Sequence, residues 1–598
     1  MSAPPTWSTD DLYAGFADPA FVADFERLMG CGTALGEVID RHGIRGTTPR
    51  AATAADLDAA AEVVALLDAA NDLGRTLYAF IDAYLRIDVT DETAGGLMAR
   101  LGALMGSNRG QMARFAAWLG EVNVAATAAT DPRLAVHAGW LDHLSRRARH
   151  QMSEAEETLA AELAASGSAA WTNLHAATTG RLEVEVALPG GRRRMPLAEA
   201  RGLATHADPA VREAAYRAEM EGWPPVLPLC AAALNGVKGE AAAVNRRRGW
   251  PTALDPALFA NGVGRDAYDA MTSAVVASLP DFRRVLRAKA RLHGHPGPLP
   301  WWDLMAPLPG SPAEWAWDDG VALIRDAFGR YGGSLPALLD RALAERWIDA
   351  VPRPGKAPGA SSMPFFADRS LLFVNWTGGL EQVITVAHEL GHAFHNAQLA
   401  RRPATLRDVP MSLAETASIF CETLFVHTAL EQATGADRLA LLDVHLCGHV
   451  QTVVDIHTRV LFETEVFARR ARRTLGVGEL GVIMTTAQSD AFGDALDTAT
   501  LHPHMWAVKR HYYTSQFYNW QYTFGLLFAL GLFDRFLAEP GTFRDEYEQM
   551  LADAGRATAA DLAARFGIDL AEPTFWTRSL DVLRTRIDEY ERLALSAS

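Results

Sequence analysis

The chain has 598 residues and a mass of 64.8 kDa, with 49% hydrophobic and 21% charged residues. This is the balance of a soluble globular protein and excludes a disordered, collagen-like or disulfide-stapled chain. With 56 basic and 72 acidic residues the net charge is −16, which disfavours binding to nucleic acid or to an anionic membrane, so we expect neither partner.

The compartment follows from cysteine usage and from the apolar segments. Four cysteines are spread along the chain without a CxxC pair, which fits a reducing compartment. The N-terminus lacks the basic start and apolar centre of a signal peptide. The longest apolar run, 523–533, has about eleven residues, whereas a membrane-spanning helix needs about 20. These features predict a cytoplasmic protein.

The basic residues are unevenly divided. Only four of the 56 are lysines, and the other 52 are arginines. A genome-wide codon bias explains this division most simply. A single arginine is therefore weak evidence for a function in this chain.

Most of the chain has the apolar spacing of helices. Alanine- and leucine-rich segments predict long helices over 53–87, 92–121 and 153–165. Alternating apolar residues at 182–188, followed by a Pro-Gly-Gly turn, predict one β-hairpin, after which helices resume at Leu197. A second β-like run at 370–376 precedes another helix. We expect a mainly α protein with a small sheet beside that helix.

Residues 386–395 of that helix read VAHELGHAFH. His388 and His392 are four residues apart, so both imidazoles lie on one helix face and can bind one metal ion. Glu389 lies beside that face, where it can act as general base toward an attacking water. The spacing predicts a zinc site. His395 is either a residue that supports the site or an ordinary polar residue of the helix.

A catalytic zinc ion needs a third protein ligand. Glu415, in the segment SLAETASIFCE at 412–422, is a carboxylate that a returning helix could supply. Ser412 and Glu415 also form the sequence of a helix capping box, so its position alone leaves both interpretations open. Ser418 and Glu422 follow on the same helical face and either orient a ligand imidazole or are ordinary polar positions.

Four tyrosines and one histidine occur within twelve residues at 511–522. A tyrosine O–H or a histidine N–H can stabilise the oxyanion that forms when an amide is hydrolysed. The alternative is an aromatic core or surface patch. Composition alone favours the second interpretation.

Taken together, these segments resemble oligoendopeptidase F, of the thimet-type oligopeptidase family of zinc metallopeptidases. HELGHAFH and AETASxFxE carry the resemblance most specifically. Further similar segments are WSTDDLY at 7–13, ALNGVKGE at 233–240, WDLMAPL at 302–308 and FVNWTG at 373–378. The resemblance covers nearly the whole chain. It implies an N-terminal helical region at 1–195 and a catalytic zinc metallopeptidase domain at 196–598, in a two-lobed helical fold whose lobes enclose a deep channel.

The resemblance also implies roles for individual residues. Glu415 becomes the third ligand of one Zn2+ per chain, and His511 and Tyr518 become groups that contact the oxyanion and the substrate. Weaker candidates for supporting the site or binding substrate are Ser418, Glu422, Tyr522, Phe373 and Asn375. The run from Leu371 to Trp376 would offer an edge strand to which an extended peptide adds.

The expected activity is that of a zinc endopeptidase that hydrolyses short unfolded oligopeptides with a metal-activated water. One alternative is a zinc carboxypeptidase of similar fold. Another is a peptide-binding protein without catalysis, although such a protein would not need Glu389. The sequence does not indicate an oligomeric state.

Overall fold

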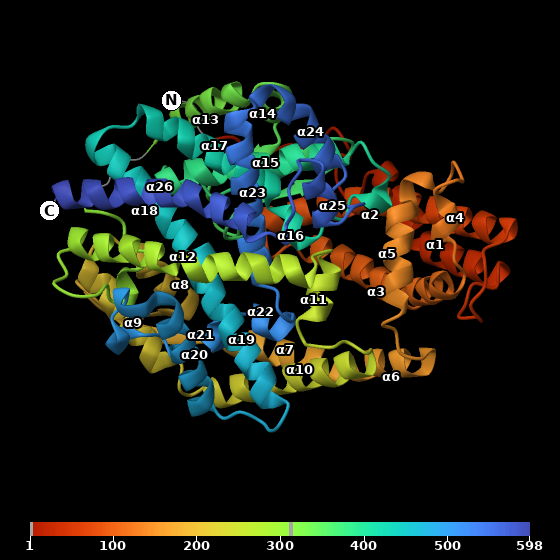
Figure 1. The fold of residues 1–598 in the computed structure, drawn as a ribbon, viewed down its shortest axis with the longest axis horizontal. Coiled ribbons are helices and arrows are strands. Elements are labelled where there is room, and N and C mark those ends of the chain that lie inside the picture. Colours follow the sequence, from red (N-terminus) through yellow and green to blue (C-terminus); the bar gives the residue numbers. More distant parts are fainter. Residues whose placement is uncertain (1–3, 310–314, 598) are drawn as a thin grey trace. The chain divides into compact units, whose positions relative to one another are not determined.

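The computed structural model describes residues 4–309 and 315–597 (Figure 1). The chain forms two compact units, each built from three segments. Unit 1 comprises Met1–Gln151, Glu314–Ala429 and Arg535–Ile568, and unit 2 comprises Met152–Ala313, Leu430–Asp534 and Asp569–Ser598. Because both units join segments that are distant in sequence, neither coincides with the expected ranges 1–195 and 196–598.

Unit 1 is helical with one small sheet. Its helices are α1 (Pro19–Arg41), α2 (Ala54–Ile87), α3 (Glu92–Glu121), α4 (Ala125–Ala128), α5 (Ala138–Ala148), α13 (Trp317–Tyr331), α14 (Ser334–Ala344), α15 (Leu380–Leu399), α16 (Met411–Ala414), most of α17 (Thr416–Gln432), α24 (Pro540–Ala552) and α25 (Ala559–Ala564). Its strands are β3 (Ile348–Asp349), β4 (Ser361–Pro364) and β5 (Ser370–Phe373).

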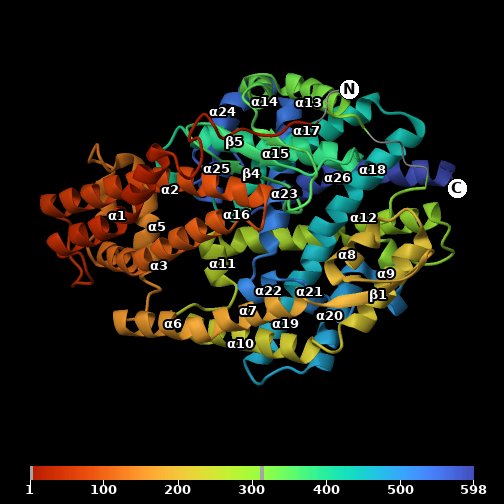
Figure 2. The ribbon, with the colours of Figure 1, turned by 180° about the vertical axis from the view of Figure 1, so that it is seen from behind.

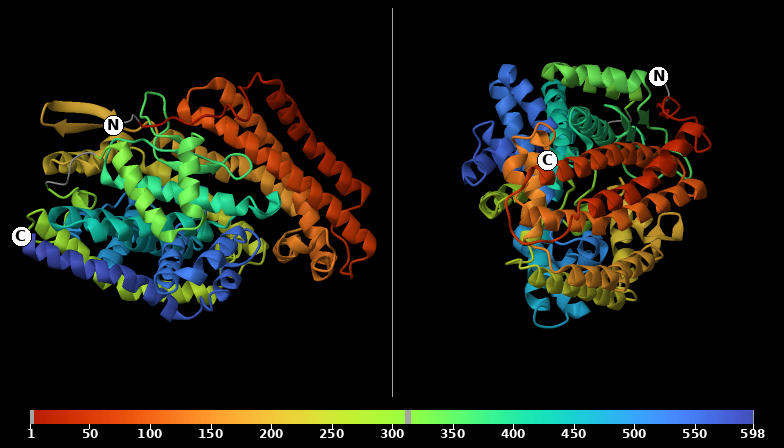
Figure 3. Two further views of the ribbon diagram at one scale, coloured as in Figure 1. Left: turned by 90° about the horizontal axis from the view of Figure 1, so that it is seen from above. Right: turned by 90° about the vertical axis from the view of Figure 1, so that its right-hand side faces the viewer.

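The helices predicted at 53–87 and 92–121 are α2 and α3, whereas α1 was not predicted. Helices α1, α2 and α3 lie side by side, as the left-hand view of Figure 3 shows. Helix α2 begins after Thr53, which forms a capping box with Asp56, so polar groups of the sequence set its start. Aromatic side chains of α1 and α2 share one apolar core with residues of β4 and β5. This core anchors the sheet on which the candidate site rests.

The small sheet has the strand order β3-β5-β4. Strand β5 is parallel to β3 and antiparallel to β4, with Ser361 opposite Phe373. The expectation that the run from Leu371 would be an edge strand is therefore wrong, because β5 is the central strand. The outer strand β4 pairs only with β5 among the described strands, and α15 packs on both (Figure 2).

Unit 2 is also helical and contains the predicted hairpin. Its helices are α6 (Glu154–Ser166), α7 (Ser168–Thr179), α8 (Leu197–Gly202), α9 (Pro209–Gly222), α10 (Leu227–Arg247), α11 (Asp255–Ala260), α12 (Arg265–Leu292), α18 (Gly435–His449), α19 (Ile456–Arg470), α20 (Val477–Phe492), α21 (Met505–Val508), α22 (His511–Thr514), most of α23 (Trp520–Ala538) and α26 (Pro573–Ala597). Strands β1 (Glu183–Leu188) and β2 (Gly191–Pro196) form the antiparallel hairpin.

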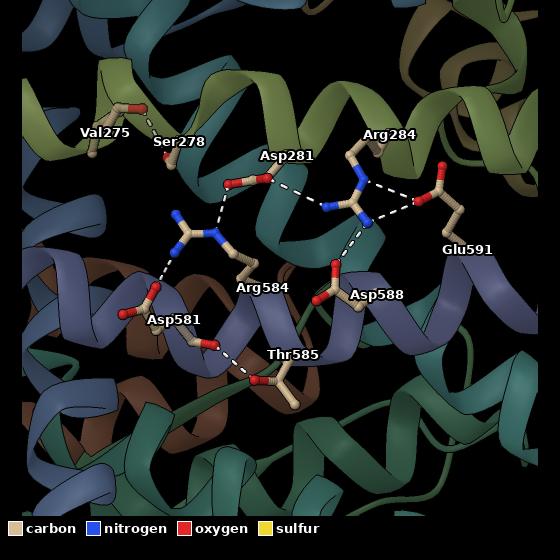
Figure 4. A network of polar contacts seen from close by, with 9 residues as sticks. All are labelled: Val275, Ser278, Asp281, Arg284, Asp581, Arg584, Thr585, Asp588 and Glu591. Atoms are coloured by element: carbon tan, nitrogen blue, oxygen red, sulfur yellow. Dashed lines mark hydrogen bonds and ion pairs between the residues drawn. The ribbon is translucent and has the colours of Figure 1, made fainter.

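Helices α12 and α26 of unit 2 are joined by charged side chains (Figure 4). Arg584 donates to Asp281 at 2.9 Å, and Arg284 binds both Asp588 at 2.6 Å and Glu591 at 2.8 Å. Because these groups share partners, they form a network rather than isolated pairs, which is the arrangement in which surface charges stabilise measurably.

A π-helical turn, η5 (Val450–Asp455), joins α18 to α19. In the part of the chain that the structure describes, 435–470 is the one helical stretch with the length and composition to cross a membrane, and 72% of its apolar window is buried inside the protein. The core helix of a soluble protein meets the same criterion, so this stretch is weak evidence for a membrane.

All four lysines lie in ion pairs. The pairs are Lys238–Glu463 at 2.5 Å, Lys289–Asp443 at 3.0 Å, Lys356–Asp349 at 2.7 Å and Lys509–Asp455 at 3.5 Å. The lysine side chains are 1% exposed in the first three pairs and 18% exposed in the last. Lysine in this protein is therefore confined to ion-paired, largely interior positions.

Candidate metal centre

Helix α15 carries the two motif histidines on one face. The helix is backed by buried apolar residues, among them Val383, Ala387 and Leu390, which fix its rotation against the core of unit 1. The rings of His388 and His392 lie 5.0 Å apart at an angle of 80°. The four-residue spacing thus places both imidazoles on one face of the helix, as the sequence predicts.

Glu415 reaches both histidines. Its Oε2 lies 3.2 Å from His388 Nε2 and 3.4 Å from His392 Nε2. The ligand atoms of the three residues lie within 4.8 Å of one another. The capping-box interpretation of Glu415 does not hold, because Pro410 is the N-cap of α16 and Glu415 is the residue at which α16 ends.

A glycine allows the two helices to approach this closely. A Cβ atom on Gly391 would lie 2.6 Å from the carbonyl oxygen of Ala417 and 2.6 Å from Cα of Ser418, closer than real Cβ contacts. Both neighbours are backbone atoms of α17, so they cannot move aside as a flexible side chain would. Gly391 thus sets the separation at which Glu415 meets the imidazoles.

Ser418 and Glu422, the two polar residues of α17 considered from the sequence, have different partners. Glu422 accepts a hydrogen bond from Nδ1 of His388 at 3.1 Å, as proposed for a group that orients a ligand ring. Ser418 instead donates to Oε2 of Glu415 at 2.9 Å and contacts the carboxylate rather than a ring. Each residue thus holds one member of the triad in place.

The charges of the triad depend on one another. Burial opposes protonation of His388, but hydrogen bonds to Glu415 and Glu422 outweigh it and raise its pKa to about 10. Burial likewise opposes ionisation of Glu415, yet the two histidines hold its pKa well below the ordinary range. A cation that binds here would replace a proton, so its affinity depends on pH.

Glu389 lies next to the triad without belonging to it. It is 6% exposed, and its Oε2 has no hydrogen-bond partner among the described residues. Burial raises its pKa, while His392 and His388 oppose that rise. A buried carboxylate oxygen without a partner is costly unless it has a role. This atom is therefore available to a water or a substrate group.

The donor set fits a divalent metal. Two imidazole nitrogens and one carboxylate oxygen are the set of a catalytic zinc site that keeps one position open. Glu422 and Ser418 supply the outer hydrogen bonds that such ligands need. The orphaned oxygen of Glu389 matches the place of a general base.

The structure places three other residues of unit 1. Phe373 is 0% exposed in the shared core, so of its two expected roles its side chain can support the site but is not exposed to a substrate. Asn375 donates to the carbonyl oxygens of Ala357 and Gly359 at 3.0 and 3.1 Å and tethers a loop. His395 is 3% exposed and thus not a surface residue of the helix.

The tyrosine-rich segment lies in unit 2, where it forms one aromatic cluster. The ring of His511 lies 4.8 Å from that of Tyr518 and 6.2 Å from that of Tyr522, and the two tyrosine rings are 5.7 Å apart. In contrast, Tyr512 and Tyr513 are buried core residues. The segment therefore contributes two tyrosines to the core, as one interpretation of its composition expects, while the cluster of His511, Tyr518 and Tyr522 stays a candidate for contact with the oxyanion and the substrate.

The proton on His511 is set by its neighbours. Its Nδ1 lies 3.3 Å from Oδ1 of Asn519, and the same oxygen accepts from Nη1 of Arg459 at 3.1 Å. Because a guanidinium only donates, the Asn519 atom facing Arg459 is the oxygen, and Nδ1 of His511 must carry the hydrogen. A neutral His511 then presents Nε2 as an acceptor.

Electrostatics keep His511 in that neutral form. Burial lowers its pKa, the hydrogen bond to Asn519 opposes this, and Arg459, Lys509 and Arg510 lower it further. Neither Asn519 nor Arg459 was singled out from the sequence. Asn519 is one ordinary polar residue, and Arg459 is one of 52 arginines, so no local signal marks them.

In unit 1, two histidines one helical turn apart, an intervening glutamate and a carboxylate from the junction of α16 and α17 define a candidate metal centre of the HExxH class. Residues 337–582 match the model of peptidase family M3, and residues 119–183 match the model described as oligopeptidase F. The chain belongs to peptidase family M3.

Comparisons with individual proteins agree with this family. The chain is 25% identical over 357 residues to an oligoendopeptidase F homolog of Lactococcus lactis subsp. lactis, an alignment that covers 58% of each chain. It is 23% identical over 347 residues to the group B oligopeptidase PepB of Streptococcus agalactiae, covering 58% of this chain and 57% of that protein. The chain thus aligns with somewhat more than half the length of these curated relatives.

The fold extends further than these alignments. The structure of oligoendopeptidase-F from Enterococcus faecium superposes with a TM-score of 0.70 at 17% identity, covering 96% of this chain and 97% of that one. The mainly helical architecture is therefore shared along nearly the whole length of both proteins.

Proposed function

We propose that this protein is a zinc-dependent endopeptidase that hydrolyses short oligopeptides. The observation that carries the proposal is the triad His388, His392 and Glu415 with the orphaned carboxylate oxygen of Glu389 beside it. A peptide-binding protein without catalysis needs neither a metal triad nor a buried base. The names of the aligned oligopeptidases support the same activity.

Each residue has a separate task in this mechanism. Zinc, when bound, would polarise the scissile carbonyl and acidify water. Glu389 accepts a proton from the attacking water and delivers it to the leaving amine. Tyr518 donates its O–H to the developing oxyanion. His511, whose Nε2 is an acceptor when neutral, holds a donor such as a peptide N–H rather than the oxyanion.

The substrate class follows from backbone recognition. Strand β4 has an outer edge in the same unit as the triad, and an extended peptide can pair with such an edge through main-chain hydrogen bonds. Pairing of this kind reads few side chains, which suits a peptidase of short unfolded peptides. The four cysteines are free, in keeping with the proposed cytoplasmic location.

The general-base assignment is tested with Glu389→Gln. We expect this variant to keep its metal and to lose about 10²–10⁴-fold in kcat/KM, the range of general acid–base catalysis. Metal content is measured by elemental analysis and turnover with an internally quenched peptide whose ends are blocked. Near-normal turnover by Glu389→Gln would falsify the role of Glu389.

The same peptide separates the rival activities. An endopeptidase cleaves it internally, whereas a carboxypeptidase leaves a peptide with a blocked C-terminus intact. A protein that binds the peptide without cleaving it, with metal bound, would be a binding module. Removal of the metal with a chelator should abolish cleavage, and added zinc should restore it.

A further inference from the structure

The turn that precedes Tyr518 in unit 2 has a strained backbone. Residues 515–517 connect α22 to the segment that carries Tyr518, and Phe517 has φ of 48°. This left-handed conformation is costly for a bulky side chain and persists only where the surroundings impose it. The question is which groups impose it.

A single buried ion pair holds both ends of this turn. Nζ of Lys238 on α10 lies 2.5 Å from Oε1 of Glu463 on α19, and the two side chains are 1% and 2% exposed. Lys238 also donates to the carbonyl oxygen of Ser515 at 2.9 Å, and Oε1 of Glu463 accepts from the N–H of Phe517 at 3.0 Å. The pair thus binds the backbone two residues apart.

The remaining side chains of the turn are tethered as well. Asn245 of α10 donates to Oε1 of Gln516 at 2.8 Å. The ring of Phe517 stacks on Phe467 of α19, with centroids 5.4 Å apart and an angle of 16°. Three successive residues are therefore each fixed by α10 or α19, and Tyr518 is the next residue.

Stability alone does not explain this arrangement. A buried ion pair adds little net stability compared with well-packed apolar residues, and a left-handed phenylalanine reduces stability. The pair Lys289–Asp443 of the same unit is equally buried but makes contacts of a different kind. Lys289 contacts the side chains of Asp443 and Cys447 at 3.0 and 3.1 Å, whereas the pair Lys238–Glu463 binds backbone groups of the turn.

We infer that Lys238 and Glu463 are positioning residues that hold the backbone of the turn so that the hydroxyl of Tyr518 is aimed at its target. This inference rests on the proposed role of Tyr518 as a hydrogen-bond donor in hydrolysis. The ion pair itself does not touch the substrate. Its effect on the reaction passes through the placement of Tyr518.

The test is a double-mutant cycle on kcat. The double variant Lys238→Met/Glu463→Gln removes both charges together, which avoids leaving one buried charge unpaired. We expect it to lower kcat by about 10–100-fold with a much smaller change in KM, as a misplaced catalytic group does. In a Tyr518→Phe background the same change should alter kcat by less than about threefold, because the hydroxyl to be placed is gone.

Lys289→Met/Asp443→Asn is the matched control. It removes an equally buried pair of the same unit and should leave kcat within about threefold in both backgrounds. Circular dichroism and thermal unfolding establish that each variant is folded. If the Lys238 and Glu463 variant does not fold, Asn245→Ala removes the milder tether to Gln516 and must lower kcat only when Tyr518 is present.

The outcomes separate the two hypotheses. If Tyr518→Phe alone leaves kcat unchanged, the proposed role of Tyr518 fails. If Tyr518→Phe lowers kcat but the loss from the ion-pair variant is fully additive, the positioning inference is overturned. The inference is also overturned if a folded ion-pair or Asn245 variant keeps the normal kcat, or if the control pair couples equally to Tyr518.

Discussion

Two histidines, one in each unit, use the same ring atom in opposite electrostatic surroundings. Nδ1 of His388 donates to the carboxylate of Glu422 at 3.1 Å, and Nδ1 of His511 donates to the amide oxygen of Asn519 at 3.3 Å. Although burial disfavours protonation of both rings, carboxylates raise the pKa of His388 to about 10, while cationic neighbours help to lower that of His511.

The charge of the acceptor thus determines what the other nitrogen can do. An anionic acceptor increases the electron density of the ring, which makes Nε2 of His388 a good metal ligand. A neutral acceptor that a guanidinium also binds leaves His511 uncharged, with a lone pair on Nε2. The same residue type is therefore suited to bind a metal in one unit and to accept a hydrogen bond as a neutral ring in the other.

The largest expected effect tests which residue of unit 2 is the oxyanion donor. Tyr518→Phe should lower kcat by about 10²–10³-fold with little change in KM, as the loss of one oxyanion donor does. Tyr513→Phe is the control, since its buried hydroxyl has no partner among the described residues and its loss should be neutral. Steady-state kinetics on one quenched peptide compare the two variants. If Tyr518→Phe and Tyr513→Phe both lower kcat only slightly, Tyr518 is not the oxyanion donor and His511 becomes the candidate.

Glu422→Gln tests whether the negative charge beside His388 matters for metal binding. It leaves a side-chain oxygen near His388 but removes the negative charge, so metal affinity should fall about 10–100-fold. Competition with a chelator at equilibrium measures the affinity. Glu381→Gln, an exposed change in the first turn of α15, should leave it unchanged. Unchanged affinity in Glu422→Gln would mean that Glu422 does not tune His388.

A third histidine, His502, shows that burial can outweigh a neighbouring carboxylate in setting the pKa of an imidazole. In unit 2, Nε2 of His502 lies 3.1 Å from Oε1 of Glu219, yet burial lowers the pKa of His502. Burial opposes ionisation of Glu219, but the neighbouring His502, the charge of Arg201 and a hydrogen bond from Trp223 lower its pKa to about 2. Both pKa values lie below those of an unfolded chain.

Stability should therefore fall as the solution becomes acidic. The contribution of ionised Glu219 is complete above its unfolded pKa of about 4.5 and is lost as the pH falls toward 2. Glu219→Gln should lower the free energy of unfolding at pH 7 by about 1–3 kcal/mol, and the gap to wild type should narrow below about pH 4.5. Denaturant unfolding checks this, with Glu213→Gln on α9 as control. A gap that does not change with pH would contradict the linkage.

The smallest expected effect concerns His511, the neutral histidine of the comparison. Arg459→Met removes a cation next to His511 and should therefore raise the pKa of His511. Long-range ¹H–¹⁵N spectra of histidine-labelled protein, assigned with His511→Gln, report the pKa and the protonated nitrogen. Arg469→Met, on the exposed face of α19, should have no effect. A proton on Nε2 of neutral wild-type His511 would contradict the assignment.

The parts of the site that depend on local spacing were predictable. His388, Glu389 and His392 follow from helical periodicity, because residues four apart share a face wherever the helix packs. Glu415 was undecided, because the same residues also spell a capping box. The structure excludes that interpretation, since α16 has Pro410 as its N-cap and ends at Glu415.

Other features depend on contacts that the sequence does not encode locally. Ser418 and Glu422 lie one turn apart on α17, yet only Glu422 reaches an imidazole, while Ser418 hydrogen-bonds the carboxylate of Glu415. The family resemblance implied an edge strand at 371–376, and the sequence did not reveal β3, which has two residues and pairs with β5. The partners of His511, which are Asn519 and Arg459, are common residue types. Their role can be recognised only from the contacts that they make in the structure.

The burial of all four lysines has a practical consequence for protein chemistry. Reagents that acylate or crosslink primary amines find no lysine with an ammonium group free of an ion pair, and three of the four side chains are 1% exposed. Because Lys238, Lys289 and Lys509 all lie in unit 2, slow labelling of these amines would report the opening of that unit rather than its surface. The scarcity of lysine thereby turns an ordinary labelling reagent into a measure of local unfolding.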